Sequence, residues 1–359
     1  MSDPPDMTPT RRAGSEAPRL RRGWTTGACA TAATRAALMV FWGEAQPRRV
    51  RITLPGGERP DFEISHMATG PDWAEAGVIK DAGDDPDVTH GAMIQARVLR
   101  SEGGVRFRAG EGVGTVTLPG LPIAPGEPAI NPVPREMITQ TVEEMARRLG
   151  QSPDILVEIS VPGGREIAAR TWNPRLGIEG GLSILGTTGI VRPFSCAAWI
   201  ASIHRGIDVA RQSGLDHVAG CTGATSEKTV QALYDLPDHG MLDMGDFAGG
   251  MLKYLARHPV PRLTVGGGIG KMTKLAQGAR DLHSARSQIS FLDLAETLGR
   301  PELANVNTAL HAYEIAGKEM VEWVAEQSCA TVRAMLPDAT RCDTVVIDRK
   351  GTILARAER

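Results

Sequence analysis

The sequence lacks the compositional features that mark several classes of protein. Its five cysteines are scattered among 359 residues and form no C-x-x-C pair, which excludes a zinc site or thioredoxin-like motif of that kind. Reduced thiols in the cytoplasm are therefore expected. The longest strongly apolar run near the N-terminus, AALMVFW at 36–42, is too short to cross a membrane and follows no basic leader. Neither a membrane span nor an export signal is predicted.

A strong excess of charge of either sign is also missing. The net charge is -2, with 23% charged and 42% hydrophobic residues, which is ordinary for a globular protein and gives nucleic acid no overall attraction. A general DNA- or RNA-binding role is disfavoured. Lysine is scarce, at seven of the 40 basic residues. The arginine excess suits bidentate recognition of carboxylates, although a GC-rich genome produces the same bias.

The length of the chain favours two lobes with a cleft between them, because a single hydrophobic core rarely grows this large. Residues 1–19 are rich in proline and polar side chains, and they predict a mobile tail. Residues 20–150 read as a β-rich α+β lobe, and residues 151–359 as a layered α/β lobe with a helical C-terminal part. No internal repeat is found in the folded part.

The expected elements follow from capping and periodicity. Thr25 and Thr26 are N-cap candidates for a first helix that ends near Trp42. Short strands separated by glycine, proline and aspartate follow from Arg49 to about Leu118. Further helices are predicted at 134–149, 195–212, 226–235, 246–257 and 302–335. Strands are predicted at 154–162, 165–170, 216–220 and 262–268, with a closing hairpin that turns at Gly351.

Three apolar segments lead into glycine turns, at 77–87, 180–191 and 262–274. The middle one, GGLSILGTTGIV, could be a ligand cradle or a plain turn, since glycine serves both purposes. The last one fails the spacing of a Walker A loop at Val265 and Met272, and of a dinucleotide fingerprint at Lys271. It remains either a tight turn or an anion site with Lys271 and Lys274 near the start of a helix.

Four aspartates cluster after the first of these segments, at Asp81, Asp84, Asp85 and Asp87. Their spacing does not supply the ligand set of an EF-hand, so no metal is expected. They either cap a turn or line a cleft where a carboxylate could take up a proton. His283 is open to the same two interpretations, as a site residue or a surface residue. No serine occupies a G-x-S-x-G elbow, which leaves serine hydrolase chemistry without support.

Several blocks in order carry a resemblance to one family. They are RRGWTTGACATAA, KDAGDDPDVTHGA, GEGVGTVTLPGL, GEPAINPVPREMI, NPRLGIEGGLSILGTTGIVRPFS, GDFAGGMLKYL and GGGIGKMTKLAQGARDLHS. Over roughly residues 20–300 the chain resembles the cobalt-precorrin-5B C1-methyltransferase family of cobalamin biosynthesis. The resemblance implies methyl transfer from S-adenosylmethionine to ring carbon C1 of a corrin precursor. It also implies that the fold is not that of a standard Rossmann methyltransferase, beside the two-lobed mixed α/β fold that length and element pattern predict.

The resemblance assigns roles to residues of this chain. It implies that the donor contacts bare amides and hydroxyls of Gly180, Gly181, Ser183, Gly186, Thr187, Thr188 and Gly189. Asp84 or Asp85 is the expected proton acceptor or ring-orienting group, with His283 as the alternative. The substrate would contact Thr26, Arg135, Lys271 and Lys274, the last three through its carboxylates. Cys221 and Leu282 stand where members of the family usually carry Asn and Thr.

The expected partner is a corrin-ring small molecule, with no nucleic acid, no membrane and a possible homo-oligomer. Whether that substrate carries cobalt stays open. Two other functions compete with methyl transfer: a carrier that shelters a corrin intermediate, and an enzyme that amidates its carboxylates with ATP. The failed Walker A spacing counts against the second. Titration with S-adenosylhomocysteine separates all three, because methyl transfer alone requires a site for that nucleoside.

Overall fold

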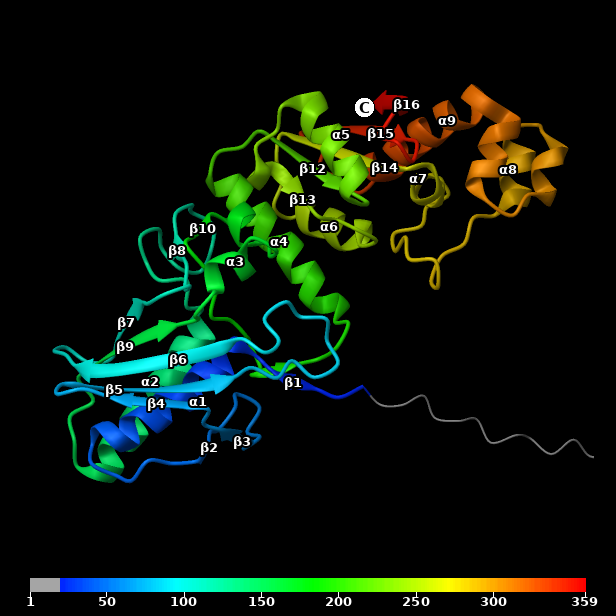
Figure 1. The fold of residues 1–359 in the computed structure, drawn as a ribbon. Coiled ribbons are helices and arrows are strands. Elements are labelled where there is room, and N and C mark those ends of the chain that lie inside the picture. Colours follow the sequence, from blue (N-terminus) through cyan, green and yellow to red (C-terminus); the bar gives the residue numbers. More distant parts are fainter. Residues whose placement is uncertain (1–19) are drawn as a thin grey trace, which may run out of the picture.

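The computed structural model describes residues 20–359, so the predicted tail at 1–19 lies outside the described residues. Figure 1 shows two lobes, with the first half of the chain in one and the second half in the other. The mixed α/β architecture and its several separate sheets confirm the predicted fold class and exclude a single Rossmann sheet. Among residues 20–359, no helix has both the length and the apolarity that crossing a membrane requires.

The first lobe is built on a five-stranded sheet. Its strands are β4 (His66–Thr69), β5 (Trp73–Ile79), β6 (Met93–Arg100), β7 (Arg106–Ala109) and β9 (Ile155–Ser160). The order across the sheet is β4-β5-β6-β9-β7. All neighbours are antiparallel except β7 and β9, which are parallel. Most pairs are close in sequence, as expected, but β9 enters between two earlier strands.

Two helices belong to this lobe: α1 (Thr26–Phe41) packs against β5 and β6, and α2 (Pro132–Leu149) packs against α1. The Thr25 hydroxyl accepts a hydrogen bond from the Ala28 amide at 3.2 Å and caps α1, as its position predicts. Alanines occupy half of the buried positions of α1, and their small side chains let the helix lie close against β5 and β6. Gly150 ends α2 in the left-handed conformation, which glycine adopts without strain.

Short elements lie around these layers. They are β1 (Gly23–Trp24), β2 (Arg49–Arg51), β3 (Asp61–Glu63), β8 (Thr115–Val116), β10 (Ile178–Glu179), β11 (Ile190–Val191), α3 (Gly164–Ala168) and the 3-10 helix η1 (Asn173–Leu176). The predicted strand at 165–170 is wrong, because α3 occupies this segment. Gly163 starts it in the left-handed conformation, a turn that the alternating pattern of side chains did not indicate.

The second lobe is a layered α/β unit. Its sheet has the order β13-β12-β14-β15-β16, from β12 (His217–Cys221), β13 (Met241–Leu242), β14 (Arg262–Gly268), β15 (Arg341–Ile347) and β16 (Ile353–Glu358). The four strands β12 to β15 are parallel, and β16 closes a hairpin with β15. The helices are α4 (Cys196–Gln212), α5 (Ala224–Tyr234), α6 (Ala248–Leu255), α7 (Ile269–Ala276), α8 (Phe291–Thr297) and α9 (Ala309–Arg333), with the 3-10 helices η2 (Asp238–Gly240) and η3 (Pro301–Asn305).

The two largest hydrophobic cores among residues 20–359 indicate where the lobes divide. One core contains residues from Ala28 to Ile184, whereas the other begins at Ile203 on α4. The expected second lobe starts at residue 151, but β9 pairs with β6 and β7 of the first sheet. We therefore propose that the boundary lies in the linker at 192–195, between β11 and α4.

Candidate functional site

Three segments far apart in sequence meet on the first lobe: residues 21–27, 81–90 and 185–194. The Trp24 amide donates to the Asp81 carbonyl at 2.7 Å, and the Arg21 amide donates to the Asp84 carboxylate at 2.5 Å. β1 pairs with β11. Three of the blocks that carry the family resemblance therefore form one surface, as a common site would require.

The predicted donor loop divides into two parts that differ in their hydrogen bonding. Residues 181–185 run between two other segments like a strand. The Leu182 amide donates to Gly112 at 2.8 Å, and the Ile184 amide donates to Ala129 at 2.8 Å. A Cβ on Gly181 would lie 2.2 Å from the carbonyl of Gly112. Ser183 is buried and donates to Asn173 at 3.2 Å. These groups are already engaged within the protein.

The second part of the loop is more open at residues 186–188, whereas Gly189 is buried and accepts from the Thr25 amide. Gly186 has φ +130°, and a Cβ there would lie 2.4 Å from the Thr25 side chain. Thr187 and Thr188 are exposed. Thr187 also lines a cavity of about 400 Å³, together with the 53–57 loop and the first turns of α2. If this loop contacts the donor, residues 186–188 are the part that can reach it.

The acidic loop is held by an ion pair whose lysine is buried. Lys80 is 1% exposed, and its Nζ donates to Asp87 Oδ2 at 2.6 Å. The other Asp87 oxygen accepts hydrogen bonds from the amide and hydroxyl of Thr89. Burial acts to raise the pKa of Asp87, but Lys80 and Thr89 outweigh it and hold this pKa below its usual value. Asp87 therefore fixes the loop rather than facing a ligand.

Asp84 and Asp85 lie on the same loop but make different contacts. Asp84 is exposed, and its carboxylate accepts from the Arg21 amide. Asp85 Oδ1 accepts from the Phe194 amide at 2.9 Å. Phe194, in the linker between the lobes, has φ +55° and is 66% exposed. A non-glycine residue in this conformation is strained and needs support from its surroundings, which Asp85 provides.

The loop that carries His283 reaches the same linker from the second lobe. Arg286 pairs with Asp281 at 2.6 Å and also donates to the sulfur of Cys196, the first residue of α4, at 3.3 Å. Asp281 accepts from the His283 amide, and the His283 side chain is exposed. The predicted acid–base residues of both lobes thus lie on loops that bracket residues 194–196.

The four predicted substrate-binding side chains make contacts within the protein. Thr26 is buried and accepts from the Leu185 amide at 2.9 Å. Arg135 donates to the carbonyls of Ile130 and Pro128 and pairs with Glu127. Lys274 is 9% exposed and donates to the Leu282 carbonyl at 3.0 Å. These contacts position loops, and a role in substrate binding stays a prediction.

Lys271 has a different setting, at the carboxyl edge of the second sheet. Its Nζ donates to the Thr222 carbonyl at 2.9 Å and lies 3.0 Å from an oxygen of Asp246. Asp243 and Glu227 lie at the same edge. Burial raises the pKa of Asp243, and the Glu227 carboxylate raises it further, against Arg175 and Lys271.

Sequence reasoning missed Glu227, Asp243 and Arg175. One signal could have found Asp243, because it follows β13 and lies about 20 residues after the glycine turn at Gly223, a spacing known from nucleoside sites. Glu227 and Arg175 left no such signal, since they meet only in the fold.

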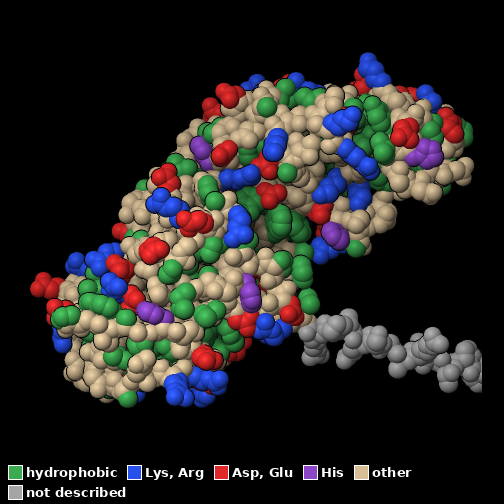
Figure 2. Space-filling model, viewed as in Figure 1, with side chains coloured by type: hydrophobic (Ala, Val, Ile, Leu, Met, Phe, Trp, Pro, Cys, Tyr) green, Lys and Arg blue, Asp and Glu red, His purple; other side chains and the backbone are tan. Residues whose placement is uncertain are grey.

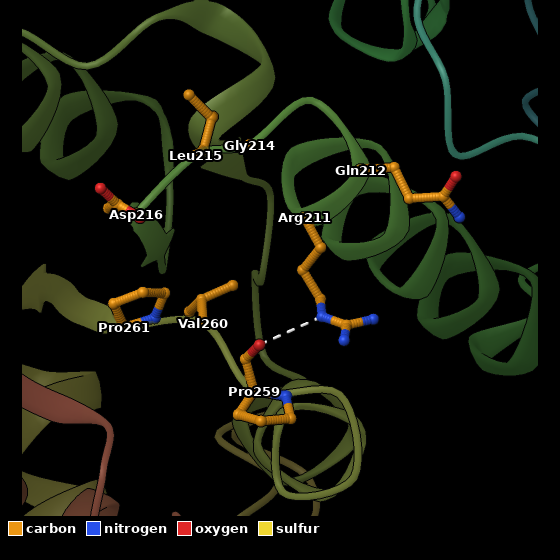
Figure 3. Close-up of a pocket in the computed structure, with 8 residues that line it drawn as sticks. All are labelled: Arg211, Gln212, Gly214, Leu215, Asp216, Pro259, Val260 and Pro261. Atoms are coloured by element: carbon orange, nitrogen blue, oxygen red, sulfur yellow. Dashed lines mark hydrogen bonds between the residues drawn. The ribbon is translucent and has the colours of Figure 1, made fainter.

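A second cavity, of about 300 Å³, lies at the opposite, amino edge of this sheet. Figure 3 shows its lining, in which Arg211 donates to the Pro259 carbonyl at 3.1 Å. Ligands of open α/β sheets bind at the carboxyl edge, so this cavity is not our candidate.

His217 is the first residue of β12, near this amino edge, and its lowered pKa should make the stability of the protein depend on pH. Burial lowers its pKa to about 4, and Arg262 and Arg341 add to this against Asp343. Below pH 6.5 this histidine binds a proton in the unfolded chain but stays neutral in the folded chain. The free energy of unfolding therefore falls as the pH falls. We expect a loss of about 2 kcal/mol between pH 7 and pH 5. Urea unfolding at both pH values measures it.

The matched variants are His217→Asn and, as a control, His311→Asn at an exposed histidine. The first should flatten the pH dependence and the second should leave it unchanged. An equal pH dependence in all three proteins would contradict the assignment to His217.

Comparison with known proteins gives a consistent result. A sequence model of the CbiD family matches residues 13–193. A protein of Brucella anthropi is 56% identical, covering 98% of this chain and 99% of the relative. One of a Bradyrhizobium species is 57% identical, covering 94% and 93%. A third, of Paramagnetospirillum magneticum, is 54% identical, covering 94% and 98%. All three are named cobalt-precorrin-5B C(1)-methyltransferase.

One solved structure is also similar. It is a cobalamin biosynthesis protein (cbiD) of Archaeoglobus fulgidus, 25% identical, covering 84% of each chain with a TM-score of 0.40. The near full-length relatives define the class of this protein, which is a methyltransferase. The chain belongs to the CbiD family.

Proposed function

We propose that this chain transfers a methyl group from S-adenosylmethionine to ring carbon C1 of cobalt-precorrin-5B or its metal-free counterpart. The observation that carries the proposal is the meeting of the family's sequence blocks around one linker. The loops at 81–90 and 185–194 come from the first lobe and the loop at 281–286 from the second. A reaction between two bound molecules needs such a place, because both must be aligned and shielded from water.

The surface beside the linker fits a large, flat ring. Leu185, Phe194 and Trp199 are 47%, 66% and 44% exposed, although such side chains are usually buried. Figure 2 shows hydrophobic, acidic and basic side chains together where the two lobes meet. Apolar side chains can pack against the faces of a macrocycle, while basic side chains receive the carboxylates at its edge.

S-adenosylmethionine supplies an electrophilic methyl group on a sulfonium. As the new carbon–carbon bond forms at C1, the carbon–sulfur bond breaks, sulfur keeps its electron pair, and the ring system loses a proton. The protein's task is to align the two molecules and to accept that proton. Asp84 and Asp85 are our proposed acceptors, with His283 as the alternative, because their loops border the linker. The five unpaired cysteines support a reducing, cytoplasmic location.

The decisive test is mass spectrometry of the corrin product after incubation with donor carrying an isotopically labelled methyl group. We expect one labelled methyl per ring, located at C1. If the protein binds the corrin ring but transfers no labelled methyl group to it, the carrier function is supported instead. If the product carries no label but its carboxylates are amidated in the presence of ATP, the protein is an ATP-dependent amidating enzyme.

A further inference from the structure

The strand order of the second lobe defines a specific place at its carboxyl edge. From β12 the chain passes through α5 to β13 on one side, whereas β14 lies on the other side of β12. The direction of winding therefore reverses between β12 and β14. In open α/β sheets, ligands bind beyond the carboxyl ends of the strands at such a reversal. Here that edge carries the turn at 222–223, the loop at 243–246 and the start of α7.

The unit β12–α5–β13 has the layout of a nucleoside site. A glycine turn at Gly223 joins the first strand to the helix, and Asp243 follows the second strand directly. In dinucleotide-binding folds, an acidic residue at this point accepts hydrogen bonds from ribose hydroxyls. A Cβ on Gly223 or Gly268 would meet nothing within 4 Å, so the space beside both turns is open.

The charges at this edge select among nucleosides. Glu227 lies in the first turn of α5, where a phosphate would otherwise bind. It is 9% exposed, and its Oε1 atom forms an ion pair with Arg175. Asp246 also lies here, beside Lys271. Three carboxylates against two basic groups disfavour a phosphate and suit a ligand with a positive charge, such as a sulfonium.

Trp199 adds a flat apolar surface. Its indole donates to the Asp243 carbonyl at 2.9 Å, and the side chain is 44% exposed. Aromatic rings of this kind stack on planar groups such as nucleobases. Trp199 lies in the first turn of α4, three residues after the Cys196 contact with Arg286. The edge is thus continuous with the linker between the lobes.

We propose that the nucleoside of the methyl donor binds at the carboxyl edge between β12 and β14, where Asp243 accepts hydrogen bonds from its ribose hydroxyls. This inference rests on the proposed function. It moves the donor away from residues 180–189, where half of the predicted loop is already hydrogen-bonded within the protein. The cavity beside Thr187 is the competing position.

Calorimetric titration of the full-length chain with S-adenosylhomocysteine distinguishes the two positions. Asp243→Asn should raise the Kd about 10- to 100-fold, because one or two hydrogen bonds to a charged acceptor are lost. Asp216→Asn, which precedes β12 at the opposite, amino edge of the same sheet, is the matched control and should bind as the wild type does. Thr187→Val should also bind normally. Normal binding by Asp243→Asn with weakened binding by Thr187→Val would overturn the inference.

A ligand analogue makes the test specific to the ribose. The 2′-deoxy form of S-adenosylhomocysteine should bind the wild type more weakly than the parent compound, whereas Asp243→Asn should discriminate between them far less. Equal discrimination by both proteins would contradict contact with Asp243.

Hydrogen exchange of the wild type covers the case in which Asp243→Asn does not fold. Binding of S-adenosylhomocysteine should protect amides at 222–223 and 243–246, and protection confined to 185–189 would overturn the inference. If the wild type binds no S-adenosylhomocysteine and makes no labelled product, the proposed function fails as well. If it makes labelled product but protects only the other loop, the inference alone fails.

Discussion

Replacing Asp87 with asparagine is expected to lower the free energy of unfolding by about 3 kcal/mol. The change keeps the size of the side chain but removes the only charge paired with Lys80 through a described hydrogen bond, at 2.6 Å. Lys80 is 1% exposed, so its ammonium would remain buried beside a neutral amide. An unpaired buried charge costs far more than the pair itself contributes. Chemical denaturation monitored by circular dichroism measures the loss.

The matched control is Asp72→Asn, at an exposed aspartate between β4 and β5, which should change stability by less than about 0.5 kcal/mol. The double variant Lys80→Met/Asp87→Asn should recover most of the loss, because it removes both charges. The folded-state pKa of Asp87 is lowered. Its contribution is therefore complete above the ordinary carboxyl pKa of about 3.9 and disappears as the pH falls through the lowered value. Equal stabilities of wild type and Asp87→Asn at pH 7 would contradict the account.

Local signals in the sequence predicted most of the helices. The Thr25 cap and the Gly150 stop lie where the pattern places them, and the hairpin turn at Gly351 closes β15 onto β16. Such features depend on residues within one turn of each other, so neighbouring letters carry the information. The two-lobed α/β architecture followed from length and from the alternation of elements.

The pairing of strands that are distant in sequence could not be predicted from local patterns of this kind. β9 inserts between β6 and β7, and nothing in the residues of β9 specifies that partner. The glycines at 180–189 show that the sequence also does not reveal why a glycine is needed at a given position. Gly181 is required because Gly112 lies against it, whereas Gly186 is required by a positive φ beside Thr25. Both look alike in a sequence, and only the partner distinguishes packing from an open loop.

The candidate site likewise contains residues that a local sequence pattern marks and residues that come together only in the fold. Asp84 and Asp85 stood out as a local cluster, and the structure places them beside a linker that no local pattern marks. Asp243 could be found by its spacing from Gly223, but the pair of Arg175 with Glu227 joins residues 52 positions apart in the chain. The spacing of residues in a sequence does not show which charges meet after folding. At the carboxyl edge of a sheet, these charges determine which ligand can bind.

Removing the charge of the proposed proton acceptor, Asp84 or Asp85, should have the largest effect on the reaction. We expect Asp84→Asn or Asp85→Asn to slow methyl transfer in a single turnover by about 100- to 10,000-fold, the range typical of a lost proton acceptor. Asparagine keeps an oxygen that can accept from the Arg21 or Phe194 amide, so the loop and linker should hold their positions. Rapid-quench analysis of labelled product at saturating donor measures this rate.

Comparison with alanine separates proton transfer from positioning. If Asp85 accepts the proton, Asp85→Asn and Asp85→Ala should be similarly slow. If it only holds the strained Phe194 through the 2.9 Å hydrogen bond, asparagine should keep the rate and alanine should lose it. Affinity for S-adenosylhomocysteine should change little in the asparagine variants, because the charge is needed for the chemical step. Near-normal rates in both asparagine variants would exclude these carboxylates and leave His283 to be tested, since its loop reaches the same linker from the other lobe.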